Sequence, residues 1–123
     1  MLREVLYAKI HRATVTECHP EYMGSITIDP DLLDAVGMHL NEKVLVADCS
    51  NSQRFETYIF KGERGSGVIG VNGAAANLTG IGHQVLIMSF CMVDEKEMKE
   101  HRPRVVICDE KNGIARELRY DAE

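Results

Sequence analysis

The chain of 123 residues has no excess of basic side chains, because 14 Lys and Arg stand against 19 Asp and Glu and give a formal net charge of −5. A protein that binds a phosphate backbone carries a basic face, so this balance argues against a small β-barrel DNA-binding module or another nucleic-acid partner. The chain also lacks an apolar run near the roughly 20 residues that span a bilayer. Residues 1–6 lead into no signal-peptide core. We therefore expect a cytoplasmic protein with neither a membrane nor a nucleic-acid partner.

Motifs for metals and nucleotides are missing as well. The four cysteines form no Cys-x-x-Cys pair and the five histidines no His-x-x-x-His spacing, so we expect free thiols and no metal site. The glycine-rich segments 62–67 and 72–76 lack the spacing of phosphate-binding loops, which argues against a nucleotide site.

Apolar residues make up 45% of the sequence, enough for the core of one globular domain. Runs rich in β-branched and aromatic residues recur between turn residues and predict about seven or eight short strands. The expected strands lie at 2–17 (one long or two short), 25–28, 43–48, 54–61, 68–71, 84–90, 105–108 and 114–118. This series is typical of a small closed β-barrel.

One helix is clearly indicated at residues 30–36. Asp29 is suited to its N-cap, Pro30 to its first position and Gly37 to the position after its end. A second, short and alanine-rich helix is expected after Asn72. The fold class is therefore mainly β with short helices.

Gly24 and Ser25 lie between a polar turn and a β-branched run. Such a pair is usually a turn, because Gly adopts positive φ freely and Ser forms local hydrogen bonds. The segment from Asn72 to Ala76 has small residues that let a ligand approach the backbone, and its amides would favour an anion. A tight turn packed against the barrel explains that segment equally well.

Two predicted strands carry charged and aromatic side chains on one face. Arg54 and Tyr58 share a face of one strand, and Lys9 and His11 share a face of the first. An exposed Arg–Tyr pair is most often solvated, a lysine is by default a surface charge, and a lone histidine is more often structural than catalytic. These residues alone do not define a site.

The segments described above occur in one order and at fixed distances. They are Lys9-Ile10-His11-Arg12-Ala13-Thr14-Val15-Thr16, Tyr22-x-Gly24-Ser25, Ile28-Asp29-x-Asp31-Leu32-Leu33-Asp34-Ala35, Arg54-Phe55-x-Thr57-Tyr58, Glu63-Arg64-Gly65-Ser66 and Val71-Asn72-Gly73-Ala74-Ala75-Ala76. Over its whole length the chain resembles the pyruvoyl-dependent aspartate 1-decarboxylases, most loosely from Asp94 onward. The resemblance implies a six-stranded double-psi β-barrel, a single domain over residues 1–123, and a homotetramer with active sites between neighbouring subunits.

The resemblance also implies that the chain makes its own cofactor. The Ser25 hydroxyl would attack the carbonyl of Gly24, and the chain would self-cleave into a small chain of residues 1–24 and a large chain of residues 25–123. The large chain would begin with a covalent pyruvoyl group derived from Ser25. By the same resemblance Thr57 donates to the developing oxyanion, with Tyr22 and Asn72 as neighbours. From composition alone, Thr57 is an ordinary strand residue and Tyr22 a half-buried ring.

The implied reaction is the decarboxylation of L-aspartate to β-alanine and carbon dioxide, which feeds pantothenate and coenzyme A biosynthesis. The pyruvoyl ketone would condense with the substrate amine and withdraw electrons from the breaking bond. Tyr58 would be the proton donor. The residues that would bind or orient the substrate are Lys9, His11, Arg54, Thr57, Gly73, Ala74 and Ala75, with the Arg54 fork suited to a carboxylate.

Two other functions stay open on the sequence. A pyruvoyl decarboxylase for another amino acid, such as glutamate, would carry the same processing motif. An uncleaved, non-catalytic barrel with a regulatory role would keep the fold without the chemistry. The sequence also leaves open whether cleavage is spontaneous or requires a maturation factor.

Overall fold

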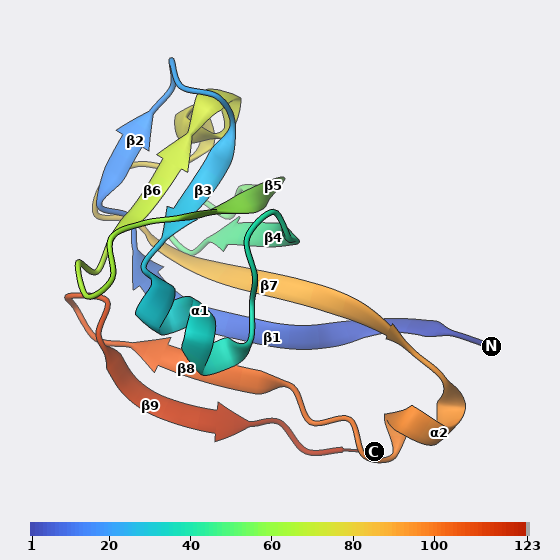
Figure 1. Ribbon diagram of the computed structural model, residues 1–123. Helices are drawn as coiled ribbons and strands as arrows, with labels where there is room; N and C mark the ends of the chain where they lie inside the picture. The colour runs from blue at the N-terminus through green and yellow to red at the C-terminus, as the bar shows by residue number, and fades with distance from the viewer. Residues whose placement is uncertain (123) are drawn as a thin grey trace.

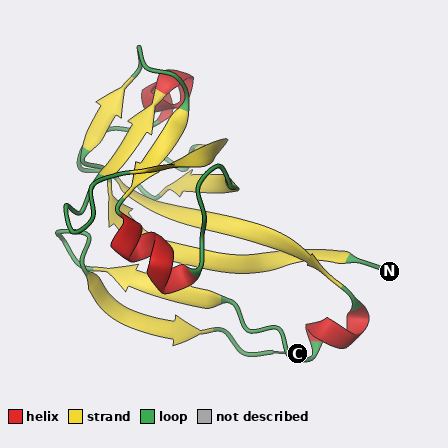
Figure 2. Ribbon diagram, viewed as in Figure 1, coloured by secondary structure: helices red, strands yellow, loops and turns green. Residues whose placement is uncertain are grey.

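The computed structural model describes residues 1–122, which form nine strands, two short α-helices and one 3-10 helix (Figure 1). The strands are β1 (Arg3–Thr14), β2 (Glu17–His19), β3 (Ser25–Ile28), β4 (Lys43–Asp48), β5 (Arg54–Lys61), β6 (Ile69–Asn72), β7 (Gln84–Val93), β8 (Arg104–Cys108) and β9 (Ile114–Arg119). The helices are α1 (Pro30–Val36), η1 (Gly73–Leu78) and α2 (Glu95–Met98). Figure 2 shows how strands dominate the molecule, so the mainly β prediction is confirmed.

The strands pair in the order β2-β6-β3-β5-β4-β7-β1-β8-β9. β2 stands at one end of this order and β1 near the other end. The two strands are consecutive in the chain and are joined at a corner. Thr16 in this corner donates its backbone N–H to the carbonyl of Ile69 at 2.8 Å. Its hydroxyl exchanges two further hydrogen bonds with Ile69, at 2.9 and 3.1 Å. Counting β1 and β2 as one bent strand, the pairings thus close a ring of six strands, in accordance with the barrel expected from the sequence.

The ring combines antiparallel and parallel pairs. β3 runs parallel to β5 and antiparallel to β6, while β2 runs parallel to β6. Outside the ring, β8 pairs in parallel with the free edge of β1, and β9 continues from β8 as a hairpin. The hairpin forms the lower edge of the molecule in Figure 1. Parallel pairs between segments far apart in the chain are the part of the fold that local periodicity does not encode.

The core fills the inside of the ring. It contains side chains of all six ring strands, and the largest that are fully buried include Ile10, Ile26, Ile59, Ile69 and Ile87, each with 0% exposure. Burying such a side chain contributes about 1.5–3 kcal/mol. The alternate residues of the same strands therefore point outward, where they can form a site.

The helix α1 covers one side of the barrel and has the caps expected from the sequence. The Asp29 side chain accepts the N–H of Asp31, Pro30 occupies the first turn, and Gly37 ends the helix with φ of 75°. The segment after Asn72 is a 3-10 helix rather than an α-helix, and β7 extends three residues beyond the predicted end, to Val93. All four cysteines are free thiols. In the described part of the chain no helix has the length and apolarity needed to cross a membrane.

Candidate active site

Ser25 opens strand β3 and is almost completely buried, with 2% of its surface exposed. Its backbone pairs with Asn72 at the end of β6, and the Asn72 side-chain amide donates to the Ser25 Oγ at 2.9 Å. The same amide nitrogen lies 3.1 Å from the Thr27 Oγ1. Asn72 thus fixes the position of the buried Ser25 hydroxyl.

The peptide before Ser25 lies directly against the start of η1. Gly73 has φ of 80°, and a Cβ built on it would lie 2.6 Å from the Gly24 Cα and 3.2 Å from the Tyr22 carbonyl oxygen. Glycine is therefore needed at position 73 for both its conformation and its contact. Gly24 itself is exposed, and a Cβ on it would meet only the Asn72 carbonyl oxygen, at 4.0 Å. The chain approaches closely here because residue 73 has no side chain.

A cleft of about 450 Å³ opens beside Ser25. Its lining includes Tyr22 and Asn72, which the sequence predicted, and residues that it did not: Glu17, His19, Met23, Thr27, Phe60 and Gly70. The Tyr22 ring is exposed, not half-buried, and stacks on His19 with ring centroids 4.4 Å apart. The only sequence signal for Glu17 and His19 is their spacing on a strand, which puts both on one face.

Strand β5 presents its outer face next to this cleft. Phe60, which lines the cleft, makes an edge-to-face contact with Tyr58 at 6.3 Å. Tyr58 is 39% exposed, and Arg54 lies exposed at the start of the same face. Thr57 is on the opposite, inner face, half-buried between two core residues of β5. The β3–β5 ladder pairs Ile26 with Ile59, so its continuation places Thr57 opposite Gly24.

Lys9 and His11 lie on β1, several strands from the cleft. Lys9 pairs with Met88 of β7, and its Nζ is 3.5 Å from the Tyr120 hydroxyl. His11 pairs with Ile107 of β8. Burial and the charges of Lys9 and Arg12 lower the pKa of His11, which favours a neutral imidazole at neutral pH. Within residues 1–122 neither side chain lines the cleft at Ser25.

The sequence model of the aspartate decarboxylase family matches residues 1–115. The chain is 53% identical over 116 residues to the aspartate 1-decarboxylase of Caldicellulosiruptor saccharolyticus, covering 94% of this chain and 91% of that protein. It is 54% identical over 114 residues to that of Bacillus licheniformis, covering 93% and 90%. The protein of that name from Neisseria meningitidis is 50% identical over 121 residues, covering 98% and 95%. The chain belongs to the aspartate decarboxylase family.

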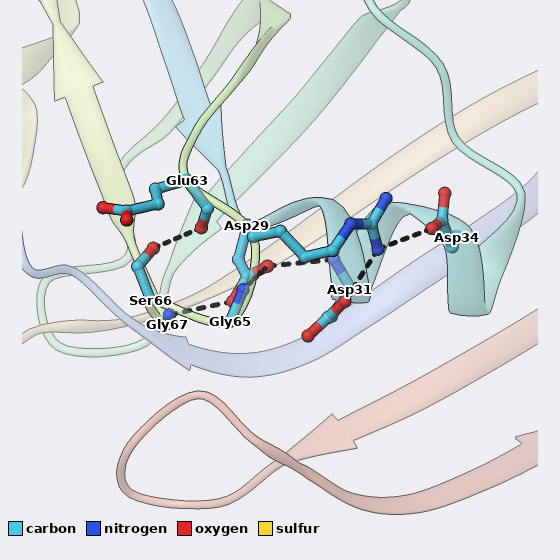
Figure 3. A network of polar contacts seen from close by, with 8 residues as sticks. Asp29, Asp31, Asp34, Glu63, Gly65, Ser66 and Gly67 are labelled. Atoms are coloured by element: carbon cyan, nitrogen blue, oxygen red, sulfur yellow. Dashed lines mark hydrogen bonds and ion pairs between the residues drawn. The ribbon is translucent and has the colours of Figure 1, made fainter.

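One motif that suggested this family, Glu63-Arg64-Gly65-Ser66, has a structural role in the fold (Figure 3). The Asp29 carboxylate accepts the backbone N–H groups of Gly65 at 3.0 Å and Gly67 at 2.8 Å. Arg64 contacts Asp31 and Asp34 of α1 at 2.7 and 2.8 Å. These contacts fix the loop between β5 and β6 on α1, away from the Ser25 cleft.

In this member of the aspartate decarboxylase family, the buried Asp48 carboxylate supports the C-terminal end of η1. Asp48, at the end of β4, accepts the Thr79 hydroxyl at 2.7 Å and the His83 Nδ1–H at 2.8 Å. The neighbouring Asn51 amide donates to the carbonyl of Leu78, the last residue of η1, at 2.8 Å. The β4–β5 hairpin that leads to Arg54 is thereby tied to the helix that begins at Gly73.

Proposed function

We propose that this chain is a pyruvoyl-dependent aspartate 1-decarboxylase, which converts L-aspartate to β-alanine and carbon dioxide. The observation that carries the proposal is the buried Ser25 hydroxyl, held by Asn72 at 2.9 Å next to the Gly24–Gly73 contact. A serine hydroxyl that follows a glycine, whose carbonyl no side chain of its own covers, is suited to an acyl shift from nitrogen to oxygen. Relatives named aspartate 1-decarboxylase at 50% and 54% identity support the same assignment.

The residues around Ser25 fit a pyruvoyl group formed from it. After a cut between residues 24 and 25, the ladders of β3 with β6 and β5 would still hold the new chain end. Thr57, opposite Gly24 in the continued ladder, would donate to the oxyanion during cleavage, with Tyr22 at its side. When present, the group supplies a ketone that withdraws electrons from the bond to the departing carboxylate.

The small chain of residues 1–24 would stay in the molecule without a covalent link. β1 pairs with β7 and β8, and β2 pairs with β6. Ala8, Ile10, Ala13 and Val15 of this segment belong to the core, with exposures of 0–1%. Loss of this strand would expose the interior of the barrel, so the two chains should remain one folded unit.

The substrate would be held by residues of the outer face. Arg54 can bind a carboxylate through two parallel hydrogen bonds, and Lys9 adds a second positive charge. The Gly73–Ala75 backbone would line the substrate on the side of η1. Tyr58, on the Ser25 side of β5, would deliver the proton to the carbon that loses carbon dioxide, and the neutral His11 would orient the site.

The positions of these residues support an assembly of several copies. Glu56, Leu45, Met88 and Lys9 form one row across β5, β4, β7 and β1, so Lys9 is three strand spacings from β5, about 14 Å measured along the sheet. The same outer face exposes large apolar side chains: Tyr58 at 39%, Phe60 at 52%, Phe90 at 42% and Met92 at 54%. We propose a homotetramer in which neighbouring subunits cover this face and complete each site.

Intact-mass measurement of the purified protein, with an assay for β-alanine, tests the function. We expect two chains divided after Gly24, labelling of the larger one by borohydride with aspartate, and loss of both cleavage and activity in Ser25→Ala. A chain that stays intact and inactive, alone and in cell extract, would contradict the proposal. Faster turnover of glutamate than of aspartate would reassign the substrate. Cleavage only in extract would indicate a maturation factor.

A further inference from the structure

Strand β2 brings a pair of titratable side chains to the cleft beside Ser25. The His19 Nε2 lies 2.9 Å from the Glu17 Oε1. Because an ionised carboxylate only accepts hydrogen bonds, Nε2 carries the proton of the neutral ring and Nδ1 is left as the acceptor. The ring is 34% exposed and stacks on Tyr22 with an interplanar angle of 10°. Glu17 and Tyr22 thus fix the orientation of the imidazole.

His19, Asn72 and Ser25 form one row across three neighbouring strands. His19 pairs with Asn72 in the β2–β6 ladder, and Asn72 pairs with Ser25 in the β6–β3 ladder. All three line the same cleft. With strands about 4.8 Å apart, the Cα atoms of His19 and Ser25 are about 10 Å apart. Both side chains line the cleft, so a water molecule held between them could bridge the remaining gap.

The next row of the sheet leaves room for such a water. It consists of Glu17, Gly70 and Thr27, and a Cβ on Gly70 would lie 3.6 Å from that of Glu17 and 3.5 Å from that of Thr27. Glycine therefore keeps the floor of the cleft free between the two side chains. The cleft of about 450 Å³ has several times the volume of one water molecule, and its walls carry polar groups.

The Ser25 hydroxyl needs a proton acceptor before it can attack. The Asn72 amide donates to the Ser25 Oγ at 2.9 Å, so the hydroxyl proton is directed away from that nitrogen. The titratable side chains that line the cleft in the described chain are Glu17, His19 and Tyr22. Of these residue types, histidine is the one that exchanges protons near neutral pH.

We propose that His19, oriented by Glu17, is the general base of self-cleavage and acts on Ser25 through one water molecule. The proposal rests on the proposed function. A bond forms between the Ser25 Oγ and the Gly24 carbonyl carbon while the hydroxyl proton passes through water to the His19 Nδ1. The bond from that carbon to the Ser25 nitrogen then breaks, and the nitrogen takes the proton back from the imidazolium. The product is an ester and a free amine with no atom gained or lost.

Few other titratable side chains surround His19. Its own strand contributes Glu17 and, on the inner face, Cys18. The following turn adds Glu21 and Tyr22. Neither β6 nor η1 contributes a titratable side chain. A change in the pH dependence of cleavage after substitution of His19 can therefore be assigned to this ring and its carboxylate partner.

Cell-free synthesis of the full chain, with intact mass followed over time, tests the proposal. General bases contribute about 10²–10⁴-fold, so His19→Ala should slow cleavage after Gly24 at least about tenfold. Added imidazole should restore part of the rate, which a purely structural defect would not allow. The pH profile of the cleavage rate should differ between the wild type and His19→Ala, because the variant lacks the proposed base.

Control variants distinguish failure of the proposed role of His19 from failure of the proposed function. His39→Ala removes an exposed histidine outside the cleft and should cleave at the wild-type rate. His19→Gln keeps the size of the side chain, so a normal Tm with slow cleavage in this variant would exclude misfolding as the cause. Cleavage of His19→Ala and His19→Gln at the wild-type rate and pH profile would overturn the role of His19. A wild-type chain that never cleaves would instead overturn the proposed function.

Discussion

Gly73 and Gly24 are in contact across 49 positions of the sequence, so closely that a Cβ at position 73 would lie 2.6 Å from the Gly24 Cα. Real Cβ atoms essentially never come that near another carbon, and the obstacle is backbone, which cannot rotate away. The φ of 80° at Gly73 adds strain for any other residue. The contact joins η1 to the peptide that we propose is cut.

Gly73→Ala should therefore block cleavage after Gly24. We expect the backbone at 22–24 to shift and the free energy of unfolding to fall by more than about 2 kcal/mol, from positive φ and the contact together. Intact mass gives the extent of cleavage, and thermal melting gives the stability.

Gly82→Ala is the matched control. Gly82 has φ of 89°, but a Cβ there would meet no atom within 4 Å. This variant should lose only the roughly 1–2 kcal/mol of the strained φ and should cleave normally. Equal cleavage in the two variants would mean that the Gly24 contact has no role in processing.

Local patterns predict much of this molecule. The caps of α1 at Asp29 and Gly37 are predictable from the sequence, because they depend only on neighbours in the chain. The alternation along β5 placed Arg54 and Tyr58 on one outer face for the same reason. By contrast, the row of His19, Asn72 and Ser25 depends on the register of two ladders between distant segments. No periodicity within β2 contains that information.

The buried carboxylate of Asp29 should stabilise the fold more than the exposed ion pair beside it. Asp29→Asn keeps the shape but replaces an acceptor oxygen by a donor that faces the N–H of Gly65 or Gly67. We expect a loss of about 1–3 kcal/mol in the free energy of unfolding. Asp34→Asn, which removes only an exposed contact to Arg64, should cost at most about 1 kcal/mol. Urea unfolding of both variants measures the difference.

Asp29 also gives stability a pH dependence. Burial by itself raises the pKa of Asp29, but the N–H groups of Asp31, Gly67 and Gly65 and the charge of Arg64 outweigh it, so the pKa is lowered. A carboxyl with a lowered folded-state pKa adds stability above its unfolded pKa, about 3.9. That stability is lost as pH falls further, through the folded-state pKa. The wild type should therefore lose stability below about pH 4, and Asp29→Asn should lose less over the same range.

Asp48 should keep the turn after η1 in its folded conformation. In Asp48→Ala the Thr79 hydroxyl and His83 lose their shared acceptor, and the Ser50 N–H, now 2.7 Å from the Asp48 Oδ1, also loses its partner. Leaving these groups unpaired should cost about 2–4 kcal/mol. Hydrogen exchange should become faster at 79–83 than in β1 and β7. Uniform acceleration over the whole chain would show instead that Asp48 acts only on global stability.

Tyr58→Phe separates turnover from self-cleavage. The ring packs edge-to-face on Phe60 at 6.3 Å, and phenylalanine keeps that contact while it removes the hydroxyl. Because Tyr58 is 39% exposed, the loss of the hydroxyl leaves no buried polar group unpaired, and stability should be unchanged. Cleavage after Gly24 should proceed at the wild-type rate, since the proposed base and oxyanion donor are intact. Formation of β-alanine should fall about 10²–10⁴-fold if this hydroxyl delivers the proton. Full activity in the cleaved variant would assign the proton to another group.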